Sequence, residues 1–313
     1  MQPTLSGRPT PSFAQRAARD FARHRIAYLM FVPVLAYYIL FHYAPMYGAV
    51  IAFKNFIPSR GIWASPWAGL KHFQTFFGSY YFGRLLRNTL LISVYSIAFG
   101  FPAPILLALL FNELKSSAFK RTVQTITYLP HFISLMVICG MLLEFLSTRG
   151  LINDLIAAFG GNRVSFFLFP EYFRPIYIAS DIWQGVGWGS IVYLAALSGI
   201  DPALYEAARI DGASRLRQAV HITLPGIMPT IVVLFILRLG NLMSVGHEKI
   251  ILLYNELLYE TADVISTFVY RKGLISFEYS YSSAVGLFNS LINFALVVTA
   301  NWISRTLSET SLW

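Results

Sequence analysis

Apolar residues fall into long runs that short polar segments separate. Each run holds roughly 20 mostly apolar residues, enough for a helix to cross about 30 Å of hydrocarbon. The pattern predicts an all-α polytopic membrane protein whose transmembrane domain covers residues 26–304. We count six spans, near residues 26–50, 88–112, 122–146, 175–198, 226–246 and 282–304.

Prolines interrupt several of these runs. Pro102 and Pro104 stand at the centre of the second run, where they predict a kink. Pro175 opens the fourth run, Pro225 precedes the fifth, and Pro229 lies within it. Prolines are tolerated in spans where neighbouring helices cover the carbonyls that they free. We therefore expect a bundle with bent members and a cavity.

The segment from Ile250 to Tyr270 is apolar enough to resemble a seventh span. It contains Glu256, Glu260 and Asp263, and each would cost about 2.5–3.5 kcal/mol at the centre of a bilayer. We therefore expect a folded loop on the outer side. The aromatic segment from Phe53 to Arg87 is expected on the same side.

Composition supports a membrane protein. Apolar residues make up 56% of the chain and charged residues 12%, with a mean hydropathy of +0.57, whereas soluble domains average about 25% charged residues. The net charge of +9 is not arranged as a basic stripe interleaved with aromatic residues. We therefore expect anionic lipid headgroups as partners, and no nucleic acid.

Charge near the ends predicts the orientation. Lys and Arg are enriched on cytoplasmic segments, and four arginines flank the first run: Arg16, Arg19, Arg23 and Arg25. A cleavable signal peptide is the rival interpretation, but this run is too long and lacks a small-residue cleavage site. We expect cytoplasmic termini, comprising residues 1–25 and 305–313. The basic surplus on the inner segments as a whole is modest.

Several chemistries find no support in the sequence. The chain has no Gly-Lys pair, so it lacks the phosphate-cradling loop of an ATPase. Cys139 is the single cysteine and lies in an apolar run, where a buried structural role is expected. No metal site is indicated by the scattered histidines His24, His42, His72, His131, His221 and His247. We expect no catalytic residues, no metal and no cofactor on this chain.

A polar segment, residues 201–225, separates the fourth and fifth runs. Asp201 is a suitable N-cap, Pro202 suits the first helical position, and Gly212 can end a helix in the left-handed conformation. The segment therefore predicts a rigid helix of roughly three turns. If the N-terminus is cytoplasmic, four spans precede this helix and it faces the cytoplasm.

The same segment resembles the permease subunits of bacterial binding-protein-dependent ABC importers. Their loop pattern E-A-A-x3-G-x9-I-x-L-P is complete here, and in those proteins it seats in a groove of the ATPase. The resemblance assigns ATPase coupling to Glu206, Ala207, Ala208, Asp211, Gly212, Leu224 and Pro225. An ordinary interfacial helix is the alternative interpretation.

Further segments are similar to one subgroup of that family, the permeases for large oligosaccharides and polysaccharides, including the alginate importer's first membrane subunit and aldouronate-type permeases. They include F-H-Y-A-P-M-Y-G (41–48), G-V-G-W-G-S (185–190) and Y-E-T-A-D-V-I (259–265). The resemblance implies a bacterial inner-membrane heterodimer with a second related permease, two ATPase subunits that bind ATP and Mg²⁺, and an extracytoplasmic solute-binding protein. Alternating access is the implied mechanism.

Polar residues within the runs are the default candidates for a saccharide path. Asp181, Gln184 and Trp188 share one helical face, as do Arg238 and Asn241 on the fifth run. The candidates are Asp181, Gln184, Trp188, Tyr193, Arg238, Asn241, Asn289 and Asn293.

Alternatives stay open for several of these candidates. Asn289 and Asn293 suit packing between helices as well as substrate binding. Asp181 and Arg238 could form a structural ion pair. Our hypothesis is that Arg238 helps to conduct an anionic saccharide such as alginate. The alternatives are a permease of the same type for neutral oligosaccharides, peptides or lipid-like molecules, and, less in keeping with the motif, a membrane scaffold or intramembrane enzyme.

Overall fold

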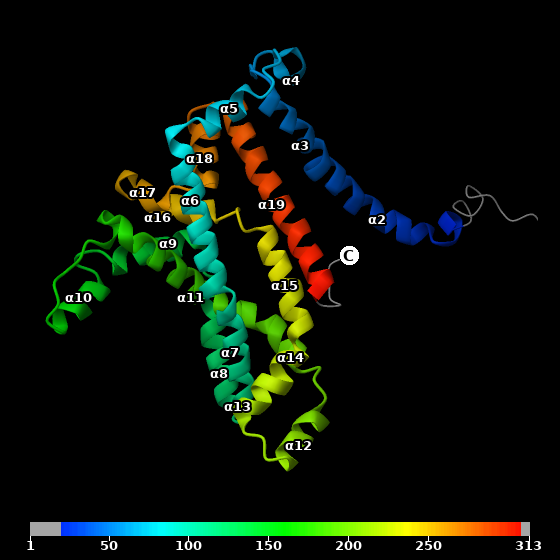
Figure 1. The fold of residues 1–313 in the computed structure, drawn as a ribbon, viewed down its shortest axis with the longest axis vertical. Helices are drawn as coiled ribbons and strands as arrows, with labels where there is room; N and C mark the ends of the chain where they lie inside the picture. The colour runs from blue at the N-terminus through cyan, green and yellow to red at the C-terminus, as the bar shows by residue number, and fades with distance from the viewer. Residues whose placement is uncertain (1–19, 308–313) are drawn as a thin grey trace, which may run out of the picture.

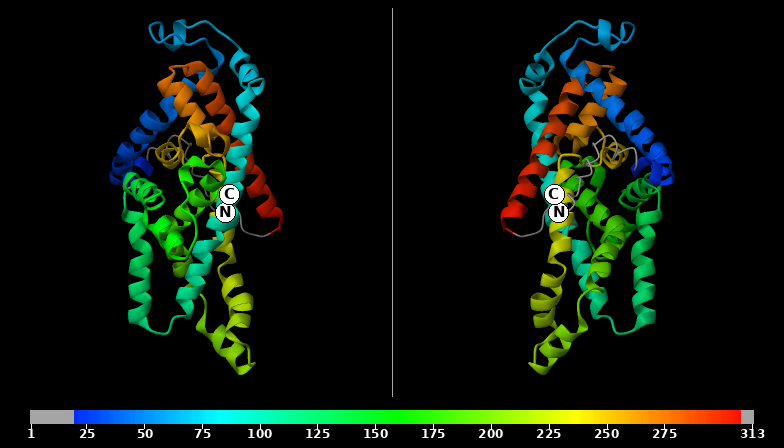
Figure 2. Two further views of the ribbon diagram at one scale, coloured as in Figure 1. Left: turned by 90° about the vertical axis from the view of Figure 1, so that its left-hand side faces the viewer. Right: turned by 90° about the vertical axis from the view of Figure 1, so that its right-hand side faces the viewer.

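The computed structural model describes residues 20–307. This part of the chain is helical and elongated, with α4 (Gly61–Ala64) at one tip and α12 (Pro202–Ile210) at the other (Figure 1). Figure 2 shows the same long axis from two further sides. The arginines expected at positions 16 and 19, and the tail from residue 308, lie outside the described residues. The all-α prediction is confirmed.

The first helical segment lies apart from the bundle over much of its length (Figure 1). It runs unbroken from Arg25 to Phe53, and the apolar side chains of its first part are exposed to the surroundings of the chain. Its elements are α2 (Arg25–Tyr38), the π-turn η1 (Ile39–Tyr43), α3 (Ala44–Met46) and the 3₁₀ turn η2 (Tyr47–Phe53); α4 and α5 (Lys71–Phe77) follow.

A single helix of 34 residues spans Tyr80 to Glu113. It comprises α6 (Tyr80–Tyr95), the π-turn η3 (Ser96–Gly100) and α7 (Pro102–Glu113). Proline lacks the N–H that would continue the α-helical ladder. The wider turn at η3 accommodates Pro102, so the predicted interruption takes the form of a π-bulge in a continuous helix.

The third apolar run is sharply bent. The helix Ser117–Phe132, made of α8 (Ser117–Tyr128) and η4 (Leu129–Phe132), meets α9 (Leu135–Phe145) at 100°. The hydroxyl of Ser134 accepts a hydrogen bond from the Val137 N–H and so caps α9 at the bend. Two short elements follow, α10 (Leu151–Ala158) and η5 (Phe166–Leu168).

The 28-residue helix α11 (Pro170–Leu197) packs against both α7 and α8. Glycines allow this close approach. A Cβ at Gly187 would lie 2.1 Å from the Thr127 carbonyl oxygen of α8, and one at Gly189 would lie 3.0 Å from the Pro104 side chain of α7. Small residues at helix contacts are the usual way for membrane helices to approach closely.

Substituting alanine for Gly187 is therefore expected to force α8 and α11 apart. Overpacking of this kind costs about 1–3 kcal/mol, and we expect a lower melting temperature of the purified protein. Gly185→Ala is the matched control, because nothing lies within 4 Å of a Cβ there. Equal thermal stability of the two variants would contradict this description of the α8–α11 contact.

The polar segment and the fifth run form a bent helical chain. After α12 come α13 (Arg215–Gln218), the π-turn η6 (Ala219–Thr223), α14 (Leu224–Gly226) and α15 (Met228–Gly240). The helix Arg215–Gly226 meets α15 at 61°. The apolar run continues to residue 246, but the helix ends at Gly240 and residues 241–246 are non-helical.

The segment after this break is folded against the bundle. It contains α16 (His247–Leu253), η7 (Glu256–Leu258), α17 (Tyr259–Ala262), α18 (Ile265–Tyr270) and the π-turn η8 (Arg271–Ile275), and α19 (Tyr279–Leu307) ends the described chain. α16 packs on α9, α17 on α11, and α18 on both α6 and α19. A buried apolar cluster that includes Ile92, Cys139, Phe173 and Ile250 joins these elements.

Within residues 20–307, three helices are long and apolar enough to cross a membrane: Arg25–Phe53, Tyr80–Glu113 and Tyr279–Arg305. The number rises to five if each of the two bent helix pairs forms one span. α11, which covers the fourth predicted run, is not among them; it carries Asp181 and Gln184 together with several glycines and serines. The count of six spans stays a prediction.

Candidate functional site

A cavity of about 250 Å³ lies where α15 ends. Its walls come from α6, η3, α11 and the non-helical residues 241–246. Non-helical backbone within a membrane is tolerated where it is buried in protein or lines a cavity. The segment 241–246 lines this cavity. The lining includes Ser93, Ser96, Tyr177, Asp181, Arg238, Asn241 and Gly246.

A second cavity, of about 270 Å³, extends along α11 toward α12. Asp181 and Arg238 line both cavities, so this pair stands at their boundary. Further along, the wall is formed by Gly185, Gly189 and Tyr193. From Asp181 to Tyr193 the helix advances about 18 Å at 1.5 Å per residue. The two cavities therefore form a polar-to-aromatic path on one side of α11.

Asp181 is held between two cations. Its carboxylate lies 4.0 Å from the Arg238 guanidinium and 3.7 Å from the Lys249 ammonium. Arg238 also donates a hydrogen bond of 2.6 Å to the Ser96 hydroxyl. The structural ion pair considered from the sequence is thus present, but as part of a triad with one positive charge in excess.

Lys249 was not anticipated from the sequence. It lies on α16, is 3% exposed, and its ammonium contacts the Tyr177 carbonyl at 3.5 Å and the Tyr177 ring at 5.0 Å from the centroid. The sequence did hold a signal, since a lysine followed by four apolar residues (Ile250–Leu253) is unusual for a solvated loop. Nothing in that pattern connects it with Asp181.

The other candidates on α11 lie away from the two cavities. Trp188 stacks on His131 with ring centroids 4.7 Å apart and planes 2° from parallel, and it meets Phe132 edge to face. Gln184 does not line either cavity. Trp188 thus faces the bend between α8 and α9, and a direct contact of Gln184 or Trp188 with substrate stays a prediction.

On α19, Asn293 holds the non-helical segment in place. Its side-chain oxygen accepts a hydrogen bond of 2.8 Å from the Met243 N–H, and its amide donates one of 2.9 Å to the Ser244 hydroxyl. Ser93 donates a further hydrogen bond to the Leu242 carbonyl. Asn289 is half-buried, and neither asparagine lines the two cavities. A direct contact of Asn289 or Asn293 with substrate stays a prediction.

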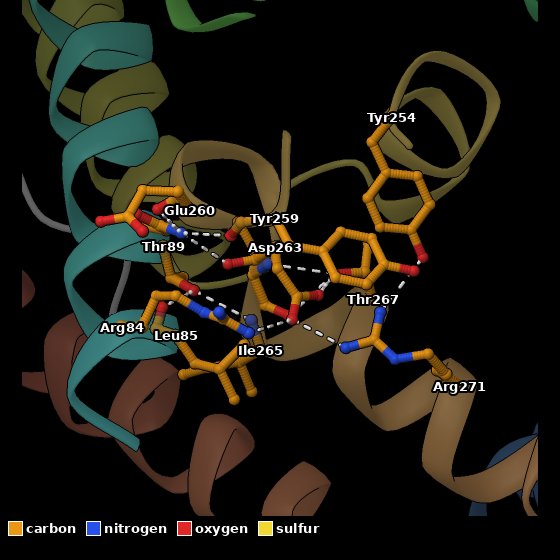
Figure 3. A network of polar contacts seen from close by, with 12 residues as sticks. Arg84, Leu85, Thr89, Tyr254, Tyr259, Glu260, Asp263, Ile265, Thr267 and Arg271 are labelled. Atoms are coloured by element: carbon orange, nitrogen blue, oxygen red, sulfur yellow. Dashed lines mark hydrogen bonds and ion pairs between the residues drawn. The ribbon is translucent and has the colours of Figure 1, made fainter. Parts of the chain in front are cut away.

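A second polar centre surrounds Asp263, which is fully buried (Figure 3). Its carboxylate lies 2.7 Å from Arg271 and 3.6 Å from Arg84, and it accepts a hydrogen bond of 2.9 Å from the Thr267 hydroxyl. Burial lowers the pKa of Arg271, but its hydrogen bond to Asp263 and the charge of that carboxylate raise it above the usual value. This explains how an acidic residue is accommodated in a folded, apolar segment.

Asn88 extends the same network toward α11. Its amide donates hydrogen bonds of 3.0 Å to the carbonyls of Glu260 and Asp263, and its oxygen accepts one of 2.7 Å from Arg174. The network therefore connects α6, α11, α17 and α18. It was missed from the sequence because the contacts of Asn88 with Arg174, Glu260 and Asp263 join residues that are 86 to 175 positions apart.

Arg271→Met is expected to destabilise the protein by about 3–5 kcal/mol, because it leaves a buried carboxylate with a single, more distant cation. Lys272→Met is the control: Lys272 is the next residue and forms a partly exposed ion pair of 2.7 Å with Glu278, of the kind worth about 0–1 kcal/mol. Thermal unfolding of the purified protein measures the effect of both substitutions. Similar melting temperatures would contradict the structural role of the Asp263 centre.

At the far tip, α12 has the caps that its sequence predicts. The Asp201 carboxylate accepts a hydrogen bond of 2.9 Å from the Ala203 N–H. At the other end Gly212 has φ +73°, and the N–H of Ala213 donates to the Ala208 carbonyl at 2.8 Å. This is the Schellman arrangement, which closes the helix after nine residues.

One face of α12 is exposed to the surroundings of the described chain. The Tyr205 hydroxyl lies 3.0 Å from that of Thr223 and ties one side of α12 to η6. The opposite side presents residues spaced i, i+3, i+4, i+7, all exposed: Ala203, Glu206, Ala207 and Ile210. Ile210 is 87% exposed. It falls at an unspecified position of the loop motif, and the helical spacing alone indicates it.

The rest of the motif forms the joint between α12 and α15. Leu224 packs in a cluster with Ile105, Tyr193 and Ile227. Pro225 follows η6 and lies in α14. Because Pro225 cannot donate a backbone hydrogen bond, the preceding turn widens to a π-turn. α12 is thus joined to the helix that carries Arg238 through a short, packed connection.

Comparison with solved structures finds a close match over nearly the whole chain. A bacterial ABC transporter involved in the import of the acidic polysaccharide alginate has a chain 46% identical to this one, with a TM-score of 0.88, covering 94% of this chain and 99% of that one. The same values hold for that transporter in complex with its alginate pentasaccharide-bound periplasmic protein.

Two curated proteins of Bacillus subtilis (strain 168) are also similar. The polygalacturonan/rhamnogalacturonan transport system permease protein YteP is 45% identical over 93% of this chain and 91% of its own length. Protein LplB is 42% identical over 93% and 92%. The family model for the inner membrane component of binding-protein-dependent transport systems matches residues 100–309, which include α12, the second cavity and the part of the first cavity that α11, α15 and residues 241–246 form. The chain belongs to this family of inner-membrane transport permeases.

Proposed function

We propose that this chain is one membrane subunit of an ATP-driven importer that moves an acidic oligosaccharide from an extracytoplasmic binding protein into the cytoplasm. The observation that carries the proposal is the triad at the boundary of the two cavities, where Arg238 and Lys249 face the single carboxylate of Asp181. A path with one excess cation favours an anion, and the hydroxyls of Ser93 and Ser96 suit a polyhydroxylated solute.

The similar proteins support an acidic cargo. The solved transporter imports the acidic polysaccharide alginate, and YteP is named for polygalacturonan and rhamnogalacturonan, both of which contain a uronic acid. Carboxylate groups carried on sugar rings are the chemical feature that these polymers share. Arg238 is suited to such a group, since a guanidinium binds a carboxylate through two parallel hydrogen bonds.

The proposed partners follow from surfaces that the chain leaves exposed. The outer face of α12 fits a groove of an ATPase subunit, which supplies the site for ATP and Mg²⁺. The exposed apolar side chains of α2 fit membrane lipid and a second, related permease. The aromatic α4–α5 end, where Trp63 is 81% exposed, lies opposite α12 and fits the binding protein. We propose in addition that both termini lie in the cytoplasm of a bacterium.

Coupling in this proposal is mechanical. Closure of two ATPase subunits displaces α12, and the joint at η6 and α14 carries that displacement to α15. Movement of α15 against α11 changes the position of Arg238 relative to Asp181. Alternating access therefore alters the charge presented at the boundary between the cavities.

The test uses the transporter assembled with its partner permease, ATPase subunits and binding protein in proteoliposomes. We expect uptake of a uronate oligosaccharide to exceed that of the same oligosaccharide with its carboxyl groups reduced to hydroxymethyl groups. The binding protein is saturated in both assays, so that the membrane step is compared. Equal uptake of the two oligosaccharides would contradict an acidic specificity of this path and favour the neutral-oligosaccharide alternative.

A further inference from the structure

The two cations of the triad differ in how firmly they are held. Lys249 is 3% exposed and fixed among the buried residues of α16, whereas the Arg238 side chain is 48% exposed. The remaining contact of Arg238 is with a neutral hydroxyl, that of Ser96. Removing the counter-ion of a buried ammonium is strongly unfavourable, while an exposed ion pair is weak.

The three charges therefore do not respond equally to an incoming anion. Asp181 can lose Arg238 at little cost, because Lys249 remains at 3.7 Å. It cannot lose Lys249 without leaving a buried charge unpaired. Arg238 lines both cavities, and Lys249 is among the lining residues of neither. An anion moving between the cavities meets the exposed cation, Arg238, and not the buried one, Lys249.

From this asymmetry we propose that Lys249 is a positioning residue for substrate selection: it keeps Asp181 neutralised so that Arg238 can exchange the Asp181 carboxylate for a carboxylate of the passing saccharide. When no substrate is present, the Asp181 carboxylate occupies the position at Arg238 that a substrate carboxylate would take. The inference rests on the proposed acidic cargo and adds to it a residue that never touches that cargo. The carboxylates of Asp181 and of the saccharide compete for the Arg238 guanidinium. Lys249 weakens the attraction of Asp181 for Arg238, because it neutralises part of the charge of Asp181.

Neutralising Lys249 should tighten the Asp181–Arg238 pair and so impair acidic cargo alone. In Lys249→Gln, we expect the apparent KM for a uronate oligosaccharide to rise by roughly tenfold, the effect of one charge-assisted contact. Uptake of the carboxyl-reduced oligosaccharide should not change. Lys249→Arg, which keeps the charge, should restore the KM toward that of the unmodified transporter.

The decisive variant removes the competitor as well. Asp181→Asn combined with Lys249→Gln leaves Arg238 without a rival carboxylate and leaves no buried charge unpaired. We expect this double variant to take up the uronate oligosaccharide with a KM equal to or below that of the unmodified transporter. The double variant also tests the inference if the Lys249→Gln transporter fails to assemble, as judged by copurification of the subunits.

Each outcome decides the inference. Selective impairment in Lys249→Gln with recovery in the double variant supports it. Unchanged acidic uptake in Lys249→Gln, or an assembled double variant without acidic uptake, overturns it. Failure of the proposed function looks different, because Arg238→Ala would then take up the uronate oligosaccharide normally whatever Lys249 does.

Discussion

Arg238→Ala is expected to reduce uptake of a uronate oligosaccharide by about 10- to 100-fold, the equivalent of about 1.5–3 kcal/mol for a hydrogen bond to a charged group. Asp181 keeps Lys249 as a partner in this variant, so no charge is left unpaired and the fold should be unaffected. Arg238→Lys should give an intermediate rate, because an ammonium keeps the charge but not the planar pair of donors. Uptake by proteoliposomes containing the assembled transporter measures both variants.

Arg149→Gln is the matched control for this experiment. Arg149 is exposed in the turn after α9 and lines neither cavity. We expect the Arg149→Gln variant to take up the uronate oligosaccharide as fast as the unmodified transporter. If Arg238→Ala transported the uronate oligosaccharide as well as the control, the proposed path for an acidic cargo would be wrong.

Glu206→Ala is expected to lower the ATPase activity that substrate and binding protein stimulate, while the complex still assembles. Glu206 and Ile210 lie on the exposed face of α12, and truncation of a central interface residue costs about 2 kcal/mol or more. Ile210→Ser should have a comparable effect, because it removes the most exposed apolar side chain of that face. Steady-state ATP hydrolysis with saturating binding protein measures the loss.

Glu144→Ala on α9 is a suitable control, since Glu144 is exposed and lies far from α12 in the sequence. Its stimulated activity should match that of the unmodified complex. Full stimulation in both α12 variants would remove the coupling role that we assign to this helix. If the α12 variants lost copurification of the ATPase subunits but kept the stimulated ATP hydrolysis, α12 would contribute to binding of the ATPase and not to coupling.

The sequence predicted α12 well because local interactions determine it. Asp201, Pro202 and Gly212 act on backbone groups within a few residues, and the structure has the expected cap and the left-handed Gly212. Long apolar runs likewise predicted the helical class. These features require no knowledge of which helix lies beside which.

The breaks in the helices were harder to predict. Residues 241–246 fall within the fifth predicted span, yet Ser93 and Asn293 bond the backbone of this segment and replace the helical ladder. The bend before α9 similarly depends on the cap at Ser134. Tertiary hydrogen bonds of this kind leave no periodic signature in a hydropathy pattern.

Of the substrate-path candidates, the structure brings Asp181, Tyr193, Arg238 and Asn241 to the two cavities. Helical spacing correctly grouped residues on one face but gave no information about the neighbour of that face. Trp188 therefore stacks on His131 instead of lining the path. Lys249 was missed because its partner lies 68 positions away, on another helix. The contact of any candidate with a saccharide remains a prediction.

The central claim is that a separate ATPase drives this chain through α12, and a cross-link tests it most directly. A cysteine at the exposed Ala207 would carry a photoactivated cross-linker in intact cells, with Ala64→Cys on α4 as the control at the opposite tip; the native Cys139 is 1% exposed and should not react. We expect Ala207→Cys to capture a cytoplasmic nucleotide-binding subunit and Ala64→Cys to capture none. Failure of Ala207→Cys to capture such a subunit, in cells that still import the oligosaccharide, would contradict the account.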